Sequence, residues 1–218
     1  MPARTLRLVS PRTGFGSVRV RMPHAEAGQR IGLLGGSFNP PHPAHVLITE
    51  IALRRLALDE VWWLVSPGNP LKSRTGEAAQ AHRMEQARRM ATDTRIKVTG
   101  FESDLPTAYT AATLSFLKRR KPHVQFVWLM GADNLATIHR WRAWRTIFEL
   151  MPIAVADRPR WRLKALASPA ARAFSRYRVA EEKAVTLPAA PAPAWTFLTG
   201  PLSDLSSTAI RARRSNTA

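Results

Sequence analysis

The sequence contains no cysteine, few acidic residues and no long apolar run. Without cysteine there is no disulfide framework and no thiol chemistry, and such a chain suits a reducing compartment. A membrane-spanning helix needs about 18 or more consecutive apolar residues, and no such run is present. The first residues also lack the apolar centre of a secretory signal. We therefore expect a cytoplasmic protein that does not use a membrane.

Acidic residues are scarce beside basic ones, because 15 Asp and Glu face 33 Lys and Arg, for a formal net charge of +18. Such an excess favours an anionic partner, either nucleic acid or the phosphates of nucleotides. Arginine is spread through the chain, so part of the excess is ordinary solvated surface. A nucleic-acid-binding protein is kept as an alternative, although no recognition helix or aromatic strand motif accompanies the charge.

The 218 residues, 45% of them hydrophobic, are enough for one domain with a full core. Residues 1–29 are basic, carry proline and glycine and show no sustained period, which predicts a flexible or loosely docked extension. From residue 30 onward, short apolar runs alternate with helical segments. We expect residues 30–218 to form a single domain.

Alternating strands and helices predict an α/β fold with a parallel, Rossmann-like doubly wound sheet and right-handed crossovers. The expected strands are 31–34, 61–65, 95–99, 124–130, 153–156 and 195–198, and the expected helices are 45–58, 78–92, 109–120, 134–138, 141–150 and 208–214. Residues 160–178 have room for a short basic helix, and residues 187–194, rich in Ala and Pro, suit an extended connector. Ligands of such sheets bind beyond the carboxyl ends of the strands, so the loops there should share one crevice.

The most informative stretch is residues 31–45, IGLLGGSFNPPHPAH. A buried strand ends in Gly35 and Gly36, and a proline-rich turn then leads into a helix. Glycines let a backbone approach phosphates, and the free N–H groups and dipole of a helix N-terminus favour an anion. His42 and His45 lie at the mouth of this turn, on one side of the helix start. We infer a phosphate site; zinc is the alternative, but no third ligand is evident.

Polar residues also follow the second, third and fourth predicted strands. Lys72 is placed where an ammonium can neutralise a phosphate, although a surface lysine is the simpler interpretation. Thr107 or Thr110 either caps the next helix or leaves its N-terminus open to a carboxylate. Asp133, two residues after Gly131, either approaches ribose hydroxyls or caps a helix.

Two further groups complete the predicted site. Trp141 and Trp144 lie three residues apart on one predicted helix, where one packs in the core and the other can stack on a flat ring. Near the C-terminus, Ser207 and Thr208 start a helix with Arg211 three residues on. Their hydroxyl, N–H and guanidinium groups suit a second phosphate, and a plain capped helix is the alternative.

Together these stretches resemble the bacterial nicotinate-nucleotide adenylyltransferases of the nucleotidylyltransferase superfamily. The superfamily turn is GG[ST]F[DN]P followed by HxGH, and this chain has GGSFNP and HPAH, with Ala44 in place of the glycine. The stretches TAYTAATL, GADNL with WRAW, and SSTAIR narrow the resemblance to this family, over residues 30–214. The close alternative is the shorter phosphopantetheine adenylyltransferases, which share the first turn but lack the WxxW segment.

The resemblance implies an enzyme of NAD biosynthesis that transfers the adenylyl group of ATP to nicotinate mononucleotide, with Mg²⁺. Such an enzyme would be a monomer or homodimer, without a specific nucleic acid or membrane partner. The resemblance assigns catalysis to His42, His45, Lys72 and Arg211, which contact the ATP phosphates. It assigns substrate binding to the following residues: Gly35, Gly36, Ser37 and Phe38 at the phosphates and nicotinate ribose; Thr107, Tyr109 and Thr110 at the nicotinate carboxylate; Trp141 on the pyridine ring; Gly131 and Asp133 at the adenosine ribose; Arg158 by the adenine; Ser207 and Thr208 at the triphosphate. No residue is assigned as a metal ligand.

Overall fold

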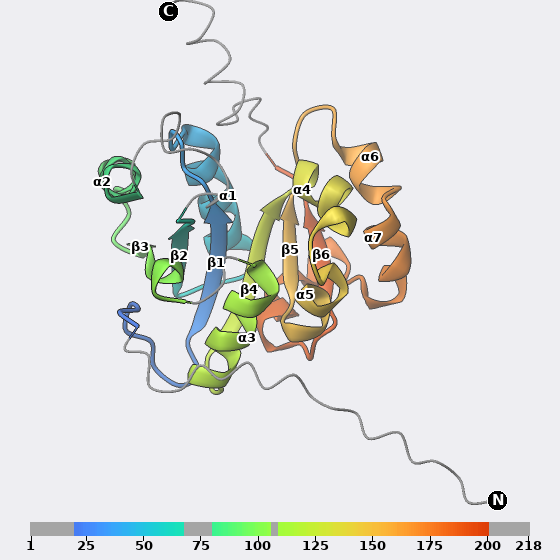
Figure 1. The fold of residues 1–218 in the computed structure, drawn as a ribbon. Helices are drawn as coiled ribbons and strands as arrows, with labels where there is room; N and C mark the ends of the chain where they lie inside the picture. The colour runs from blue at the N-terminus through green and yellow to red at the C-terminus, as the bar shows by residue number, and fades with distance from the viewer. Residues whose placement is uncertain (1–19, 68–79, 106–108, 201–218) are drawn as a thin grey trace, which may run out of the picture.

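The computed structural model describes residues 20–67, 80–105 and 109–200. Within these ranges, six strands form one parallel sheet in the order β3-β2-β1-β4-β5-β6. The strands are β1 (Arg30–Gly36), β2 (Glu60–Val65), β3 (Ile96–Thr99), β4 (Gln125–Gly131), β5 (Ile153–Ala156) and β6 (Trp195–Leu198). The predicted α/β, Rossmann-like class is confirmed, and each strand lies within two residues of its predicted bounds. All carboxyl ends point to the top of Figure 1.

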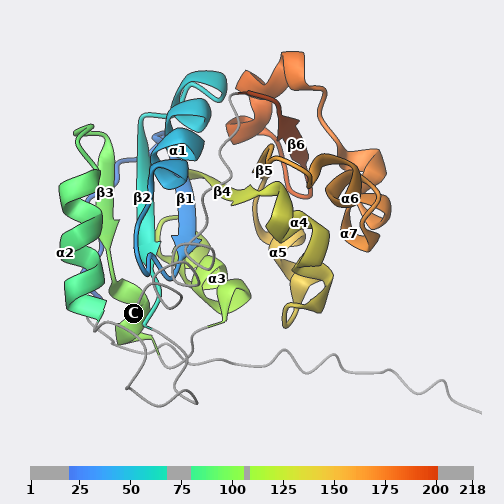
Figure 2. The ribbon, with the colours of Figure 1, turned by 90° about the horizontal axis from the view of Figure 1, so that it is seen from above.

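Helices cover both faces of the sheet (Figures 1 and 2). On one face lies α1 (Pro43–Arg55), and on the other lie α3 (Thr110–Arg120), α4 (Ala132–Thr137) and α5 (Trp144–Leu150), while α2 (Gln80–Met90) flanks β3. The shorter helices are α6 (Arg162–Leu166) and α7 (Pro169–Ala173), with 3-10 turns η1 (Phe101–Asp104), η2 (Ile138–Arg140), η3 (Ser175–Tyr177) and η4 (Glu181–Ala189). In the described part of the chain, no helix combines the length and apolar character that a bilayer crossing requires.

The strands are apolar on both faces, which explains their unbroken hydrophobic runs. Leu33 belongs to the core on the α3 side, together with Trp128, whereas Leu34 belongs to the core on the α1 side, together with Trp63. Because side chains alternate along a strand, this pattern fixes which way the residues at the carboxyl end of β1 point.

The segment between β4 and β5 differs from its prediction. A single helix over 141–150 was expected to carry both tryptophans, but α5 begins at Trp144, and Trp141 instead ends η2. Ala143, between them, has a left-handed φ of +52°, which a continuous helix does not allow. The two rings are therefore oriented independently.

The region between β5 and β6 holds more regular structure than its composition predicted. Two short helices, α6 and α7, occupy the place of one basic helix, and Ser168 separates them by accepting the Ala171 N–H at 3.2 Å. The prediction of an extended connector over 187–194 is wrong in its first residues, because η4 continues to Ala189. Leu187 and Pro188 are buried there, so the apolar side chains of this stretch serve the core.

Residues 20–29 pack at the amino ends of the strands. Ala25 is buried, and its carbonyl accepts a hydrogen bond from Nζ of Lys121 at 3.2 Å. The Gly28 N–H donates to the carbonyl of His123 at 2.8 Å. This part of the predicted extension is docked on the domain, while residues 1–19 and the predicted helix 208–214 lie outside the described residues.

Candidate active site

The glycine turn lies at the carboxyl end of β1. Gly35 and Gly36 are the last two strand residues and face opposite sides of the sheet. A Cβ on Gly35 would lie 2.4 Å from the indole of Trp128, so only glycine fits there. A Cβ on Gly36 would meet the Phe38 ring at 3.4 Å and Nε2 of His45 at 3.9 Å. A methyl group would therefore fit at Gly36, on the side of the turn that faces Phe38 and His45, whereas packing requires glycine at position 35.

His42 and His45 cap the start of α1 reciprocally. His42 is the N-cap residue and is only 2% exposed. Its backbone N–H donates to Nδ1 of His45 over 3.2 Å, and its carbonyl accepts the His45 backbone N–H at 2.9 Å. Nδ1 of His45 also lies 3.3 Å from the His42 carbonyl, so this nitrogen accepts the His42 N–H in one tautomer of the neutral ring and donates to the carbonyl in the other. Nε2 of His45 faces the glycine turn, 3.9 Å from the position of a Cβ on Gly36.

Both imidazoles are neutral near pH 7. Burial lowers the pKa of His42 to about 4, and the positive charge of Arg158 contributes. The pKa of His45 falls to about 3, first through burial and then through the neighbouring His42 and Arg158. The two ring centroids are 3.8 Å apart, which disfavours two adjacent cations. A bound polyphosphate would raise both pKa values, because negative charge favours the protonated imidazole.

Side chains from β2 and α1 hold the histidine pair in place. The Phe38 ring stacks on His45 with centroids 4.4 Å apart and on Trp63 at 5.2 Å. Nε1 of Trp63 donates to Oγ1 of Thr49 at 2.8 Å, and that hydroxyl donates to the His45 carbonyl at 2.8 Å. These contacts attach the first turn of α1 to β2 and fix the His45 ring.

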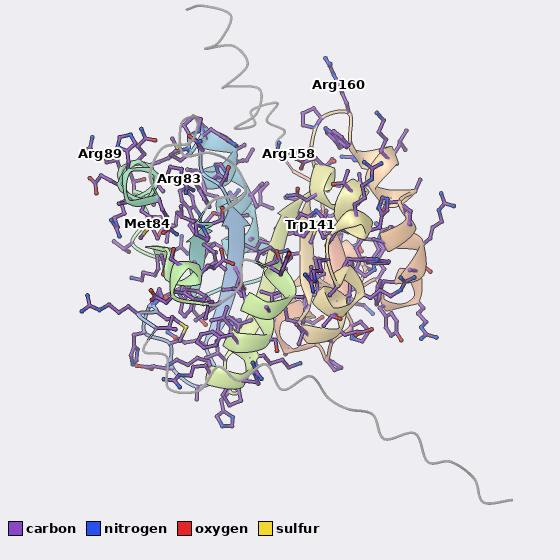
Figure 3. All side chains as sticks on the ribbon, viewed as in Figure 1. Arg83, Met84, Arg89, Trp141, Arg158 and Arg160 are labelled. Carbon is purple, nitrogen blue, oxygen red and sulfur yellow. The ribbon has the colours of Figure 1, made fainter. Side chains whose placement is uncertain are left out.

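The loops after β4 and β5 supply the other half of the site. Oδ1 of Asp133 lies 3.2 Å from Nε of Arg158, which follows β5, and both side chains are largely buried. A Cβ on Gly131 would lie 2.4 Å from the same carboxylate oxygen, so any larger residue there would displace the Asp133 side chain. Figure 3 shows Arg158 at the upper edge of the sheet. The charge of Arg158 contributes to the lowered pKa of His42 and His45, so this ion pair lies near the histidine pair.

Trp141 and Tyr109 lie on neighbouring segments at the α3 side of the sheet. Trp141 is half-buried against the core of that face. The next residue, Arg142, places its guanidinium carbon 4.6 Å from the centre of the Tyr109 ring. Tyr109 is the N-cap residue of α3, and its ring is 51% exposed. The N-terminus of α3, with Thr110 in its first turn, therefore lies beside the segment that carries Trp141 and Arg142.

Two capping predictions are wrong. Thr110 does not cap α3, because Tyr109 occupies the N-cap position without a side-chain hydrogen bond to the helix. Asp133 does not cap α4, because Gly131 is the N-cap residue and the aspartate lies in the first turn. The ribose role of Asp133 therefore stays as its predicted function.

Several predicted site residues lie outside the described residues, namely Lys72, Thr107, Ser207, Thr208 and Arg211. Their roles stay predictions. The zinc alternative gains no support, because the described residues contain no group of three His, Cys, Asp or Glu side chains that could hold a metal.

Sequence reasoning missed Arg83, on α2. This arginine is 1% exposed, and its Nη1 donates to the carbonyl of Ser37 in the glycine turn at 2.5 Å. Because α2 contains several arginines, the sequence alone predicts that each of them lies on the solvent-exposed surface. The available signal was its spacing, since Arg83 lies one turn before Ala87, which is also buried.

Comparisons with known proteins show which family the chain belongs to. A profile of the family described as cytidylyltransferase-like matches residues 33–213. A probable nicotinate-nucleotide adenylyltransferase of Rhizobium johnstonii is 56% identical over 190 residues, which is 87% of this chain and 96% of that protein. One of Methylorubrum extorquens is 56% identical over 184 residues, covering 84% of this chain and 100% of its own length. The chain belongs to the bacterial nicotinate-nucleotide adenylyltransferases.

A solved structure agrees with the adenylyltransferase fold. The nicotinic acid mononucleotide adenylyltransferase of Plasmodium falciparum, in complex with NaAD, superposes with a TM-score of 0.62. The superposition covers 84% of this chain and 83% of that one, at 17% sequence identity, so it bears on fold alone. Membership of the adenylyltransferase family confirms the resemblance drawn from the sequence motifs. The unusual Ala44 is buried inside α1, so this adenylyltransferase turn closes with alanine in place of glycine.

Proposed function

We propose that the protein transfers the adenylyl group of ATP to nicotinate mononucleotide, forming nicotinate adenine dinucleotide and pyrophosphate in NAD biosynthesis. Family membership supports this pair of substrates. The observation that carries the proposal is the histidine pair beside the glycine turn, with Arg158 near enough to contribute to the lowered pKa of both imidazoles. Imidazoles, a guanidinium and a helix N-terminus around a glycine turn suit a polyphosphate.

The reaction needs alignment and charge stabilisation rather than a base. A 5′-phosphate oxygen of the mononucleotide forms a bond to the α-phosphorus of ATP, and the bond from that phosphorus to the oxygen bridging to the β-phosphorus breaks. The nucleophile is already an anion near neutral pH, so no proton has to be removed. Negative charge grows on the departing pyrophosphate, and the imidazoles of His45 and His42 would offset it by hydrogen bonding.

The other predicted residues would bind the two substrates. Gly35, Gly36, Ser37 and Phe38 would line the phosphates; Gly131 and Asp133 the adenosine ribose; Arg158 the adenine; Trp141, Tyr109 and Thr110 the pyridine ring and its carboxylate. Lys72, Thr107, Ser207, Thr208 and Arg211 would extend these contacts. The ion pair of Asp133 and Arg158 supports this arrangement, because the charge of Arg158 acts on His42 at the glycine turn.

Mg²⁺ would enter with ATP as part of the substrate. The described residues offer no cluster of three potential ligands for it, and the carboxylate of Asp133 is already paired with Arg158. Mg²⁺ commonly keeps several waters and binds through substrate phosphates. The residues of this chain would therefore position the nucleotide, and the nucleotide would hold the ion.

A panel of acceptors tests the proposal. The protein is mixed with MgATP and, separately, nicotinate mononucleotide, its amide form or phosphopantetheine, and pyrophosphate release is measured. We expect the fastest release with nicotinate mononucleotide and a product with the mass of the dinucleotide. Release with phosphopantetheine alone would overturn the proposal. No release at all, with tight DNA binding at about 150 mM salt and a steep salt dependence, would favour the nucleic-acid alternative.

A further inference from the structure

Arg83 is a buried cation that the proposed reaction does not use. Its side chain is 1% exposed, yet its Nη1 reaches the Ser37 carbonyl across 46 residues of sequence. Figure 3 shows Arg83 on the side of α2 that faces the strands, whereas Arg89 lies on the outer side. Burying a guanidinium is costly, so the fold maintains this contact against a desolvation penalty.

The start of α2 is itself fixed to the carboxyl edge of the sheet. Nε2 of Gln80 donates to the carbonyl of Val65, the last residue of β2, at 2.7 Å, and its Oε1 accepts the Ser103 hydroxyl. The Ser66 N–H, directly after β2, donates to the Gly36 carbonyl at 2.9 Å. The end of β2, the start of α2 and the glycine turn are thus tied together, and Arg83 extends from this anchored turn of helix.

The peptide that Arg83 holds belongs to the strained part of the glycine turn. Phe38 has a φ of +48°, in the left-handed region that residues other than glycine seldom adopt. The Ser37 carbonyl and the Phe38 N–H of one trans peptide point in opposite directions. Holding the carbonyl toward α2 therefore turns the N–H away from α2 and fixes the peptide plane next to the strained residue.

The orientation of the Phe38 ring directly affects His45, the proposed catalytic histidine. Its buried ring stacks on His45 at 4.4 Å, with 27° between the ring planes. A turn that relaxed toward an ordinary φ would carry this ring away from His45, because the ring direction follows from the backbone at Phe38. His45 would then lose one of the surfaces that fix its imidazole.

We propose that Arg83 is a positioning residue: through the Ser37 carbonyl it holds Phe38 in its left-handed conformation, and through the Phe38 ring it fixes His45. Arg83 touches neither substrate in this arrangement. The expected change in kcat, described next, rests on the proposed adenylyl transfer. The expected change in the NMR spectrum of His45 does not.

The first test compares Arg83→Lys and Arg83→Met with Arg89→Met. Arg89 is the matched control, because it lies on the same helix but is exposed and pairs with Glu85 at 3.1 Å. We expect kcat to fall about 10- to 100-fold in both Arg83 variants, as for loss of one hydrogen bond from a charged group, with KM for ATP within about 3-fold. Arg89→Met should be unchanged. A folded Arg83 variant with kcat within about 3-fold of the original would overturn the proposal.

A double-mutant cycle tests the route through Phe38. Phe38→Leu alone should lower kcat, and Arg83→Lys combined with Phe38→Leu should lower it little further, because both remove the same support. Multiplying effects would mean that Arg83 acts independently of Phe38, which contradicts the proposal. If Arg83→Met fails to fold, Arg83→Lys and this cycle still decide the question.

Nitrogen NMR of the histidine rings separates this inference from the reaction itself. Without substrate, the ring-nitrogen signals of His45 should be the same in the original protein and in Arg89→Met. In Arg83→Lys we expect these signals to shift, because the ring loses a contact that holds its Nδ1 between the His42 N–H and the His42 carbonyl. An unchanged His45 signal would reject the positioning role even if the protein proved inactive toward every acceptor, while a changed signal in an inactive protein would uphold the positioning role and reject the proposed reaction.

Discussion

Among single residues, His45 should matter most for turnover. Its Nε2 faces the glycine turn, 3.9 Å from the position of a Cβ on Gly36, where the leaving phosphates would lie. We expect His45→Ala to lower kcat about 10²-fold or more, the loss typical for one donor to a developing oxyanion. The matched control is His82→Ala, since His82 is exposed on α2 and contacts Gln86 at 3.0 Å. Near-normal turnover in His45→Ala would remove this imidazole from the chemistry.

The two tryptophans that follow β4 should respond differently to the same truncation. Trp141→Ala should raise KM for the mononucleotide about 10-fold with little change in kcat, if its ring stacks on the pyridine. Trp144 instead meets Phe148 and Phe174 edge-to-face at 6.2 and 5.9 Å. Trp144→Ala should therefore lower the melting temperature and leave KM unchanged. An unchanged KM in Trp141→Ala would make Trp141 a core residue, and steady-state kinetics with thermal melts separates the two results.

Contacts between residues close in sequence could be predicted, whereas contacts between residues that only the fold brings together could not. His42 and His45 share one helix turn, so their proximity follows from spacing alone. The ion pair of Asp133 and Arg158 depends on the adjacency of β4 and β5, which the sequence does not state. The contact of Arg83 with the glycine turn joins α2 to β1 and was invisible for the same reason.

At the scale of elements, packing between β1 and β4 makes the two turn glycines unequal. Gly35→Ala would force its methyl against the buried Trp128 indole, and we expect a loss of about 1–3 kcal/mol in the free energy of unfolding. Gly36→Ala has ordinary contact distances, so its melting temperature should change little. The added methyl would lie on the side of the turn that faces His45, where the phosphates are proposed to bind. The kcat of Gly36→Ala should therefore fall. Equal melting temperatures for the two variants, measured by calorimetry, would contradict this assignment.

Element boundaries show where sequence patterns carry information. Strands buried on both faces gave unbroken apolar runs, so their bounds were close to correct. The stretch that became η4 contains alanine and proline, which suggested an extended chain, but its burial against the α1-side core decided its shape. Tertiary packing overrode local composition in that region.

For the whole molecule, the histidine pair couples stability to pH. In the unfolded chain these imidazoles titrate near pH 6.5, whereas in the folded chain their pKa values are about 4 and 3. Between those limits the unfolded state binds more protons, so stability falls as pH drops from 7 toward 4. His42 alone should contribute about 2–3 kcal/mol of this loss at pH 4.5.

Thermal melts between pH 7.5 and 4.5 measure this dependence. We expect the decline to be shallower in His42→Gln, because that variant has one buried imidazole fewer to protonate on unfolding. A parallel decline in His42→Gln and the original protein would show that His42 is not responsible. The control is His82→Gln, whose exposed side chain should leave the pH profile unchanged.

The strand order has a consequence for how the protein is made. β1 leaves the ribosome early, but its neighbour β4 follows only after β2 and β3. Until then one edge of β1 lacks its partner, and neither Asp133 nor Arg158 has been made. The central strand is therefore completed only late in synthesis, and a chain truncated before β4 should not form the sheet around the histidine pair.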